Sequence, residues 1–312
     1  MTNRYLLAPA TVELDIPPTP SLDGQRLLAV LAFDSGWFAQ GMACIATLRR
    51  RAPKALQIAV LGMGLSARER KTLQEQDIEH LEMPRTIAIP DGAPGHTRAM
   101  ACRPLLRDLF PGFDVYFWVD SDIRFLRDDA VEFYLRCAGM ADRPVVISAE
   151  LDAAYNIYRT PTVYQGWSAE RQERIGRLFG ADAAAAVHGF PQYNAGLWCM
   201  HKDAPVWDLY REHVERGAAQ AYDRLWEQDS MNLAILASGM KVWTAPTTHN
   251  WICSMGIPLF RRDTGEWLRP AYPYVPLAVA HLTDQRSTID VAGHGRMTLG
   301  SFYEKSGLLK AA

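Results

Sequence analysis

The chain has 312 residues, of which 48% are hydrophobic, and a formal net charge of −2 at pH 7. This nearly balanced charge excludes the strongly basic surface typical of nucleic-acid-binding proteins and the polybasic segment of a membrane anchor. We therefore expect small-molecule partners and no nucleic acid. The sequence leaves open whether the protein is a monomer or a homo-oligomer.

Cysteine usage and the N-terminal segment indicate the compartment and the domain limits. The five cysteines are odd in number, far apart and mostly within apolar runs, which argues against a disulfide framework or a zinc site and fits a reducing, cytoplasmic environment. Residues 1–24 hold four prolines but no basic-then-apolar signal, and no stretch reaches the roughly 20 apolar residues of a membrane-spanning helix. We expect a Pro-rich lead-in at 1–24, one large domain at 25–290 and a C-terminal tail or lid at 291–312.

The first half of the chain alternates apolar runs with amphipathic segments. Strands are expected at 26–33, 56–61, 78–83 and 115–119. Helices are expected at 37–51, 66–76 and 97–110. Ser66 and Glu69 form the capping-box pattern at the start of the second helix. The order of these elements predicts an α/β fold in which helices flank a single Rossmann-like, mostly parallel central sheet.

Two carboxylates follow the most apolar strand. Val115–Val119 consists only of β-branched and aromatic residues and leads into Asp120, Ser121 and Asp122. Such a run is typical of a strand buried on both faces, and ligands bind at the carboxyl ends of strands in open α/β sheets. The two Asp side chains would form a hard oxygen site for Mg²⁺ or Mn²⁺, which can hold a diphosphate. An ordinary turn or a helix N-cap also uses these residue types.

The end of the first strand allows two interpretations. Asp34 and Trp37 could form a nucleotide-base pocket, in which Asp34 accepts from the base and Trp37 stacks on it. Alternatively, Asp34 or Ser35 caps the following helix and Trp37 belongs to the core.

The second half of the chain contains further polar clusters. Asn194 is followed by Ala195 and Gly196, and small residues permit a close approach of the backbone to a ligand. A helix that opens near residue 226 carries carboxylates and amides in its first turn, which the helix dipole also favours. His281 ends a short apolar strand, where it is either a third metal ligand or a structural residue.

In this order, the motifs resemble those of the GT-A nucleotide-sugar glycosyltransferases, specifically the retaining galactosyl- and glucosyltransferases of family 8, over roughly 26–290. The matching segments are Asp34–Trp37, Asp120–Asp122, Tyr193–Gly196, Glu227–Asn232 and His281. Arg103 lies 17 positions before Asp120 (120 − 103), which is the spacing of the family's donor-contacting arginine.

The resemblance implies a GT-A fold with a C-terminal extension and a transferase that moves a hexose from a UDP-sugar to a saccharide or other hydroxyl acceptor, with retention of anomeric configuration. It implies Mn²⁺ or Mg²⁺ bound by Asp120, Asp122 and His281. The implied donor-binding residues are Asp34, Trp37, Arg103, Asp120, Ser121, Asp122, Ala195, Gly196 and Arg286. The implied catalytic residues are Gln228, Glu227, Asp229 and Asn194.

Some positions depart from the family pattern. The family usually has Gly three positions and Lys six positions after its metal His, whereas this chain has Asp284 and Ser287, so Arg286 is the candidate to grip the diphosphate. Glu150 and Asp152 follow another expected strand and either bind acceptor hydroxyls or cap the next segment. The Trp and Tyr residues of 155–167 lie where acceptor specificity would be set.

Two other functions fit the sequence less well. A sugar-phosphate nucleotidyltransferase would need a Gly-rich, basic loop after the first strand, and Asp34–Trp37 is neither. A non-catalytic nucleotide- or carbohydrate-binding protein would bind UDP without turnover, and the intact acidic segments at 120–122 and 227–229 argue against it.

Overall fold

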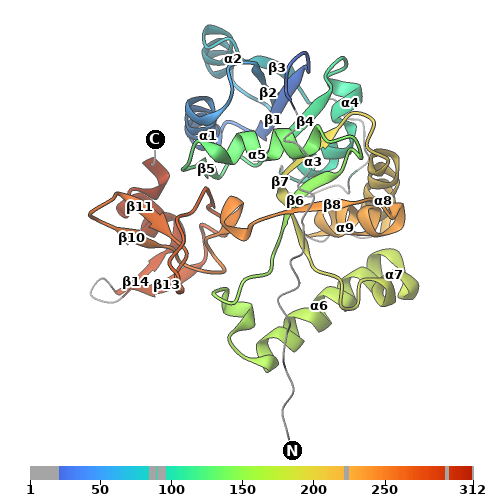
Figure 1. The fold of residues 1–312 in the computed structure, drawn as a ribbon, viewed down its shortest axis with the longest axis vertical. Coiled ribbons are helices and arrows are strands. Elements are labelled where there is room, and N and C mark those ends of the chain that lie inside the picture. Colours follow the sequence, from blue (N-terminus) through green and yellow to red (C-terminus); the bar gives the residue numbers. More distant parts are fainter. Residues whose placement is uncertain (1–20, 84–88, 90–95, 221–224, 292–294, 311–312) are drawn as a thin grey trace, which may run out of the picture.

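The computed structural model describes residues 21–83, 89, 96–220, 225–291 and 295–310; most of the expected lead-in and parts of the tail lie outside these ranges. A seven-stranded sheet forms the centre of the molecule, in the order β3-β2-β1-β4-β7-β6-β8 (Figure 1). All of its strands run in one direction except β7, which is antiparallel to both neighbours. The bounds are β1 Leu27–Phe33, β2 Leu56–Gly62, β3 Glu79–Glu82, β4 Val115–Val119, β6 Val145–Ala149, β7 Tyr193–His201 and β8 Val242–Ala245.

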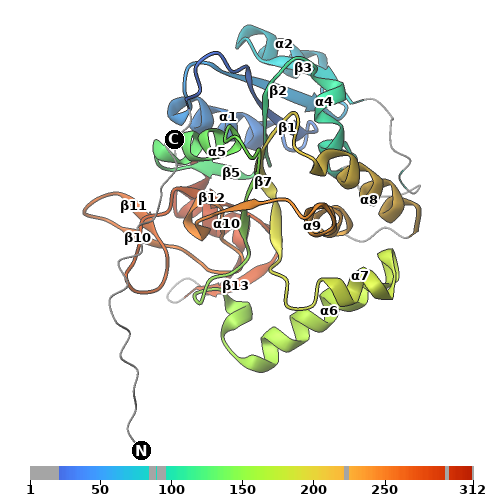
Figure 2. The ribbon, with the colours of Figure 1, turned by 45° about the vertical axis from the view of Figure 1, so that its right-hand side comes forward.

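Helices cover both faces of this sheet. The apolar sides of α1, α2 and α5 pack on one face, and α3, α4, α8 and α9 pack on the other. Figure 2 shows the two helix layers on opposite sides of the strands. Because both faces are covered, β1 and β4 are buried at every position, which explains their uninterrupted apolar runs. The bounds are α1 Phe38–Arg51, α2 Ala67–Glu75, α3 His96–Cys102, α4 Leu106–Leu109, α5 Asp129–Ala138, α8 Val206–Gln220 and α9 Trp226–Ser238.

A smaller β region packs beside the end of β4. Its three-stranded sheet has the order β5-β12-β9, with β12 antiparallel to β5 and parallel to β9. Two hairpins and a helix complete the region, and a separate apolar cluster holds it together. The strands of the β13–β14 hairpin lie on both sides of the predicted boundary between residues 290 and 291. The bounds are β5 Ile123–Phe125, β9 Trp251–Ile252, β10 Leu259–Arg261, β11 Glu266–Leu268, β12 Val279–His281, β13 Thr288–Val291, β14 Gly295–Thr298 and α10 Leu299–Lys305.

An inserted helical segment separates β6 from β7. Its helices are α6 (Pro161–Phe179) and α7 (Ala181–Ala186), which lie below the sheet in Figures 1 and 2. Thr160 accepts a hydrogen bond from the backbone N–H of Val163, so a side-chain cap fixes where α6 begins. The buried apolar side chains of α6 belong to its C-terminal part, and its first two turns are largely exposed.

The structure confirms the α/β class and the mostly parallel sheet, and the expected strands and helices of the first half lie within a few residues of their predicted positions. The capping box of Ser66 and Glu69 is present. One helix differs: the expected helix at 97–110 is broken by a 3₁₀ turn at Arg103–Leu105. Pro104 lacks a backbone N–H and disfavours helical backbone at the preceding residue, which accounts for the break. Among the described residues, no helix is both long and apolar enough to cross a membrane.

Candidate active site

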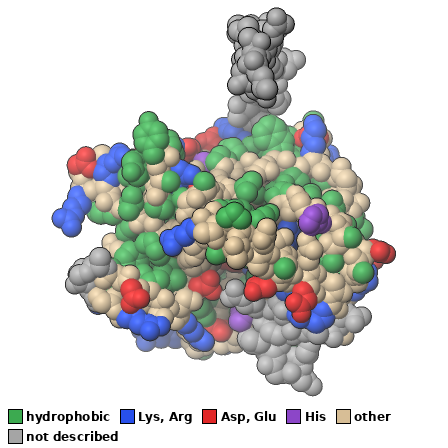
Figure 3. All heavy atoms as spheres, turned by 90° about the horizontal axis from the view of Figure 1, so that it is seen from below, with side chains coloured by type: hydrophobic (Ala, Val, Ile, Leu, Met, Phe, Trp, Pro, Cys, Tyr) green, Lys and Arg blue, Asp and Glu red, His purple; other side chains and the backbone are tan. Residues whose placement is uncertain are grey.

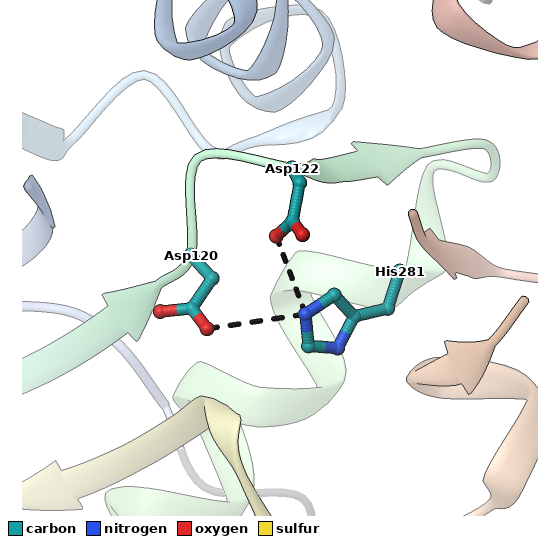
Figure 4. A group of neighbouring side chains, drawn as sticks. All are labelled: Asp120, Asp122 and His281. Carbon is teal, nitrogen blue, oxygen red and sulfur yellow. Dashed lines mark ion pairs between the residues drawn. The ribbon is translucent and has the colours of Figure 1, made fainter. Parts of the chain in front are cut away.

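Three predicted metal ligands meet at the end of β4. Asp120 follows β4, Asp122 precedes β5 and His281 ends β12, and Figure 4 shows their side chains pointing toward one another. One potential ligand atom from each residue lies within 4.8 Å of the other two. The Nε2 atom of His281 is 3.3 Å from Asp122 Oδ1 and 3.9 Å from Asp120 Oδ2.

Backbone pairing explains why residues so far apart in the sequence converge. Since β7 is antiparallel to β4, its first residues lie at the carboxyl end of β4, and the backbone N–H of Asp120 donates to the carbonyl of Gly196 (2.8 Å). The N–H of Leu282 donates to the carbonyl of Asp122 (3.0 Å), which fixes β12 beside the loop. A Cβ atom at position 196 would clash with the His281 ring and lie 2.7 Å from Asp120 Oδ2, so only glycine fits there.

The electrostatics of this group favour an ion pair in the absence of a metal. Burial opposes ionisation of Asp122, but the charge and hydrogen bond of His281 outweigh it and lower the pKa of Asp122. Burial likewise opposes protonation of His281, but the Asp122 carboxylate, with a smaller contribution from Asp120, raises the pKa of His281. The carboxylates of Asp120 and Asp122 thus both face Nε2 of His281, and a bound cation could replace the proton on that nitrogen.

Asn250 orients the histidine for metal binding. Its Oδ1 atom lies 3.1 Å from His281 Nδ1, and its Nδ2 donates to Asn194 Oδ1 (3.0 Å). Because this oxygen can only accept, Nδ1 of His281 carries a proton, and when the Nε2 proton leaves, the Nε2 lone pair is available to a cation between the two carboxylates. Two carboxylates and one imidazole form a donor set that suits Mn²⁺ and is compatible with Mg²⁺.

Arg103 fixes the orientation of Asp120. Its buried guanidinium donates to Asp120 Oδ1 (2.6 Å) and to Glu227, and lies 4.9 Å from the centre of the Trp118 ring. The indole N–H of Trp118 also donates to Asp120 Oδ1 (2.8 Å). These two donors occupy one oxygen of the carboxylate, so the other, Oδ2, is the one that faces His281.

A cavity of about 220 Å³ lies beside the metal ligands. Its lining includes Asp34, Trp37, His96, Arg103, Trp118, Asp120, Ser121 and Asp122. Trp37 is 37% exposed, so it does not belong to the core. Asp34 Oδ1 accepts from the backbone N–H of Trp37 (3.0 Å), which stabilises the turn before α1. The predicted base-binding residues therefore lie at one cavity. The alternative that Asp34 or Ser35 caps the helix is wrong, because the N-cap of α1 is Trp37 and no side chain caps it.

His96 was missed by the sequence reasoning. It lines the same cavity, and desolvation, followed by the charge of Arg103, lowers the pKa of its imidazole. The charge of Arg286, an exposed residue in the turn after β12, contributes to the same shift. Asp284, at the position where the family usually has glycine, adopts φ +53°, the left-handed conformation that glycine favours. The only signal for His96 in the sequence was its place just before an expected helix.

A second polar cluster surrounds Glu150, next to Asn194. The carboxylate accepts hydrogen bonds from the amides of Gln192 (2.7 Å), Asn194 (2.8 Å) and Gln228 (3.1 Å). Burial raises the pKa of Glu150. The Oε1 atom of Gln228 accepts from the backbone N–H of Ala195 (3.1 Å). Sequence reasoning had noted Glu150 only as a carboxylate at a strand end and could not foresee that three amides converge on it.

The two carboxylates beside Gln228 are each paired with an arginine. Glu227 is fully buried, accepts from Arg103 and from the hydroxyl of Tyr210, and has its pKa raised by burial to about 7. Asp229 is also fully buried and accepts two hydrogen bonds from Arg174 of α6 (2.6 and 3.2 Å). Arg174 lies in the insertion and gave no sequence signal. Asp152 pairs with Arg269 and accepts from the N–H of Ala154, so it anchors the segment after β6.

No family model matches the sequence, and no curated protein matches it. Solved structures do resemble the fold. The galactosyltransferase LgtC in complex with donor and acceptor sugar analogs gives a TM-score of 0.52 at 18% identity, over 90% of this chain and 96% of that one. Mouse xyloside xylosyltransferase 1, in its apo form, gives 0.50 at 11% identity, over 82% of this chain and 97% of that one. An active-site mutant of LgtC gives 0.52 at 16% identity, over 82% and 86% of the two chains. The chain therefore has the GT-A fold of these glycosyltransferases.

Proposed function

We propose that the chain is a metal-dependent glycosyltransferase that transfers a hexose from a UDP-sugar to an acceptor hydroxyl with retention of anomeric configuration. The observation that carries this proposal is the convergence of Asp120, Asp122 and His281 beside the cavity that Trp37 borders. A diphosphate that bridges the ligand group and the cavity would place a base near Trp37 and a sugar near Asn194. The GT-A fold is consistent with this arrangement.

The cavity residues would bind the nucleotide. Trp37 offers its exposed ring for stacking on uracil, and Asp34 would accept from the base in addition to its bond with the Trp37 backbone. Ser121, whose neighbours on both sides are metal ligands, would contact the ribose or phosphate. Arg286 is an exposed cation whose charge acts on His96 of the cavity, and it would grip the diphosphate in place of the family's lysine.

The metal ligands would hold Mn²⁺ or Mg²⁺, which supplies Lewis-acid neutralisation of the charge that develops on the departing UDP. The chain's own residues position the sugar. The backbone at Ala195 and Gly196 permits close approach, and the amides of Asn194 and Gln228 would hydrogen-bond the hydroxyls of the transferred hexose. Retention requires attack from the face that UDP leaves, or a transient nucleophile on the enzyme.

Glu227 and Asp229 would act on this site through their arginines. Both are fully buried, and each holds a guanidinium that reaches it from another element. Gln228 lies between them in the sequence, so the two ion pairs fix the first turn of α9 and the direction of its amide. Glu227 and Asp229 would thus position the side-chain amide of Gln228.

The test is thermal stabilisation by UDP and UDP-sugars, each with and without Mn²⁺. We expect manganese-dependent stabilisation of the wild type, since a ligand at 100 times its dissociation constant adds about 2.7 kcal/mol to the free energy of unfolding. Asp122→Asn should abolish this stabilisation and all transfer while the variant stays folded. Asp128→Asn, which removes an exposed carboxylate six positions later, is the matched control and should respond as wild type does. A wild type that no uridine nucleotide stabilises would contradict the proposed function.

A further inference from the structure

A buried cation follows the metal loop, which we define as Asp120–Asp122. Arg124 of β5 is only 1% exposed. Among the described residues, its hydrogen bonds all go to neutral oxygen atoms of the backbone or of an amide. Burying a charge without a hydrogen-bonded opposite charge is costly, and replacing buried charged groups by apolar side chains of similar size is often neutral or stabilising. Since Ile123 and Phe125, the neighbours of Arg124 in β5, are buried and apolar, packing alone does not explain an arginine here.

Arg124 binds the backbone on both sides of Asp122. Its Nη1 atom donates to the carbonyls of Ser121 (3.4 Å) and Ile123 (2.7 Å). Its Nε atom donates to the carbonyl of Leu309 (3.2 Å). Because the donors of a guanidinium have a fixed geometry relative to one another, these contacts also fix the group itself. The metal loop is thus fastened to a segment 185 positions further along the chain.

Gln40 of α1 extends these contacts to another segment. Its Oε1 atom accepts from Nη2 of Arg124 (3.2 Å), and its Nε2 atom donates to Oε1 of Gln285 (2.8 Å). Because a guanidinium can only donate, Arg124 determines which end of the Gln40 amide faces it. The NH₂ end therefore faces Gln285 and determines the direction of that amide in turn.

Gln285 closes the turn that follows the metal ligand His281. Its Nε2 atom donates to the carbonyl of Leu282 (3.1 Å), and its backbone carbonyl accepts from the N–H of Gly300 in α10 (2.8 Å). The next residue is Arg286, the exposed cation proposed above to grip the diphosphate. The backbone that carries Arg286 is therefore held by α1 through a side chain and by α10 through the main chain.

The place of each single cation matters because charges of both signs are mixed on the surface. On the face seen in Figure 3, acidic and basic side chains lie interspersed. The formal net charge of the whole chain is −2. Such a surface attracts an anion only weakly, so a diphosphate depends on cations held at the right place relative to the metal.

We propose that Arg124 is a positioning residue that holds the two halves of the diphosphate site, the metal loop and the turn of Arg286, in one arrangement. It acts on the metal loop through two loop carbonyls and on Arg286 through Gln40 and Gln285. Arg124 thus serves both halves, whereas Gln285 serves the turn alone, so their variants should have different effects. This inference rests on the proposed function.

The first measurement is the affinity for Mn²⁺ without nucleotide, by electron paramagnetic resonance of free Mn²⁺. Arg124→Met removes the donors to both loop carbonyls and should weaken Mn²⁺ binding roughly tenfold, as loss of a partner that orients metal ligands does. Gln285→Leu leaves these donors in place and should bind Mn²⁺ as the wild type does. Arg127→Met is the matched control, because Arg127 is exposed and pairs with the exposed Asp129. It should also leave the affinity unchanged.

The second measurement compares UDP with uridine, which has no phosphate. Isothermal titration with Mn²⁺ gives the affinity for UDP, and saturation-transfer NMR without metal gives that for uridine. Gln285→Leu and Arg286→Met should each weaken UDP binding, the latter roughly tenfold, as loss of a hydrogen bond to a charged group does. Uridine binding should stay as in the wild type. The double variant should bind UDP no more weakly than Arg286→Met alone, because Gln285 acts through Arg286. Gln74→Leu, at an exposed glutamine of α2, is the control for Gln285→Leu and should change neither affinity.

Thermal unfolding without ligand shows which variants are folded. If Arg124→Met does not fold, Gln40→Leu breaks the same link at a partly buried side chain and should weaken UDP binding but not uridine binding. Unchanged Mn²⁺ affinity in a folded Arg124→Met, additive losses in the double variant, or equal weakening of UDP and uridine would overturn the inference. A wild type that binds Mn²⁺ but no UDP contradicts the proposed function, and the inference then stands or falls on the Mn²⁺ affinity of Arg124→Met. A wild type that binds no Mn²⁺ overturns both.

Discussion

The two sides of the candidate site differ in how completely their polar groups are paired. On the metal side, one oxygen of Asp120 accepts from Arg103 and Trp118, and both ring nitrogens of His281 face acceptors. Near Glu150, Oε1 of Gln192 and Nε and Nη2 of Arg171 are buried without hydrogen-bond partners. The polar groups of the metal side are therefore more completely paired than those around Glu150.

Arg103 should give the largest effect on stability. Arg103→Met leaves the carboxylates of Glu227 and Asp120 without their cation, and breaking a buried ion pair in this way typically costs about 3–5 kcal/mol. Because the pKa of Glu227 is already raised to about 7, this carboxyl can become neutral and limit the loss. Urea denaturation at 25 °C measures the change in the free energy of unfolding.

Arg107→Met is the matched control for that variant. Arg107 also pairs with a carboxylate, Asp208 (2.7 Å), and also lies over an indole ring, that of Trp207, but Asp208 is fully solvated. Removing an exposed pair of this kind changes stability by about 0–1 kcal/mol. Equal losses of unfolding free energy in the two variants would show that the buried ion pairs of Arg103 stabilise the protein no more than the exposed pair of Arg107.

Trp37→Ala tests whether the metal side ends in a nucleotide pocket. The ring is 37% exposed beside the cavity, so its loss should weaken UDP binding by about 1–3 kcal/mol, as loss of base stacking typically does, with little change in melting temperature. Isothermal titration with UDP and Mn²⁺ measures this. Tyr164→Ala removes a ring of similar exposure on α6, outside this cavity, and should leave UDP affinity intact. Unchanged affinity in Trp37→Ala would remove Trp37 from the nucleotide site.

Asn250→Ala tests whether the hydrogen-bond chain tunes the metal ligands. The variant removes the acceptor for Nδ1–H of His281, and loss of such a partner typically lowers metal affinity 10- to 100-fold. Electron paramagnetic resonance of free Mn²⁺ measures the affinity directly. Asn250→Asp keeps an acceptor at this place and should bind Mn²⁺ more tightly than Asn250→Ala. If both variants bind as the wild type does, the histidine needs no orienting partner.

The same contrast explains what could be predicted from the sequence. The strands of the central sheet and the group of Asp120, Asp122 and His281 were readable because apolar runs and short motifs encode them locally. The pairing of Arg174 with Asp229, and of Asn250 with His281, depends on segments that meet only in the folded chain. Pro104 disfavours helical backbone at the residue before it, and this local effect interrupts the helix predicted at 97–110.

The smallest predicted effect is the pH dependence of stability, which has opposite signs for Glu69 and Glu150. The side-chain hydrogen bond from Ser35, followed by those at Ser66, lowers the pKa of Glu69 below its ordinary 4.5, and this bond fastens the loop of Asp34 and Trp37 to α2. The stabilisation from the ionised Glu69 carboxylate is therefore present above pH 4.5 and is lost as the pH falls through the lowered pKa of Glu69. Burial raises the pKa of Glu150 above 4.5, so its contribution is complete below pH 4.5 and is lost as the pH rises through the raised pKa.

Urea denaturation of the wild type, Glu69→Gln and Glu150→Gln at several pH values between about 3 and 8 separates these contributions. The difference in unfolding free energy between the wild type and Glu69→Gln should shrink toward acid, because the protonated carboxyl of the wild type and the amide of the variant are then equally uncharged. Relative to Glu150→Gln, the wild type should instead lose stability toward neutral pH. A common sign for the two pH slopes would mean that the fold stabilises the charged form of Glu150, as it stabilises the charged form of Glu69.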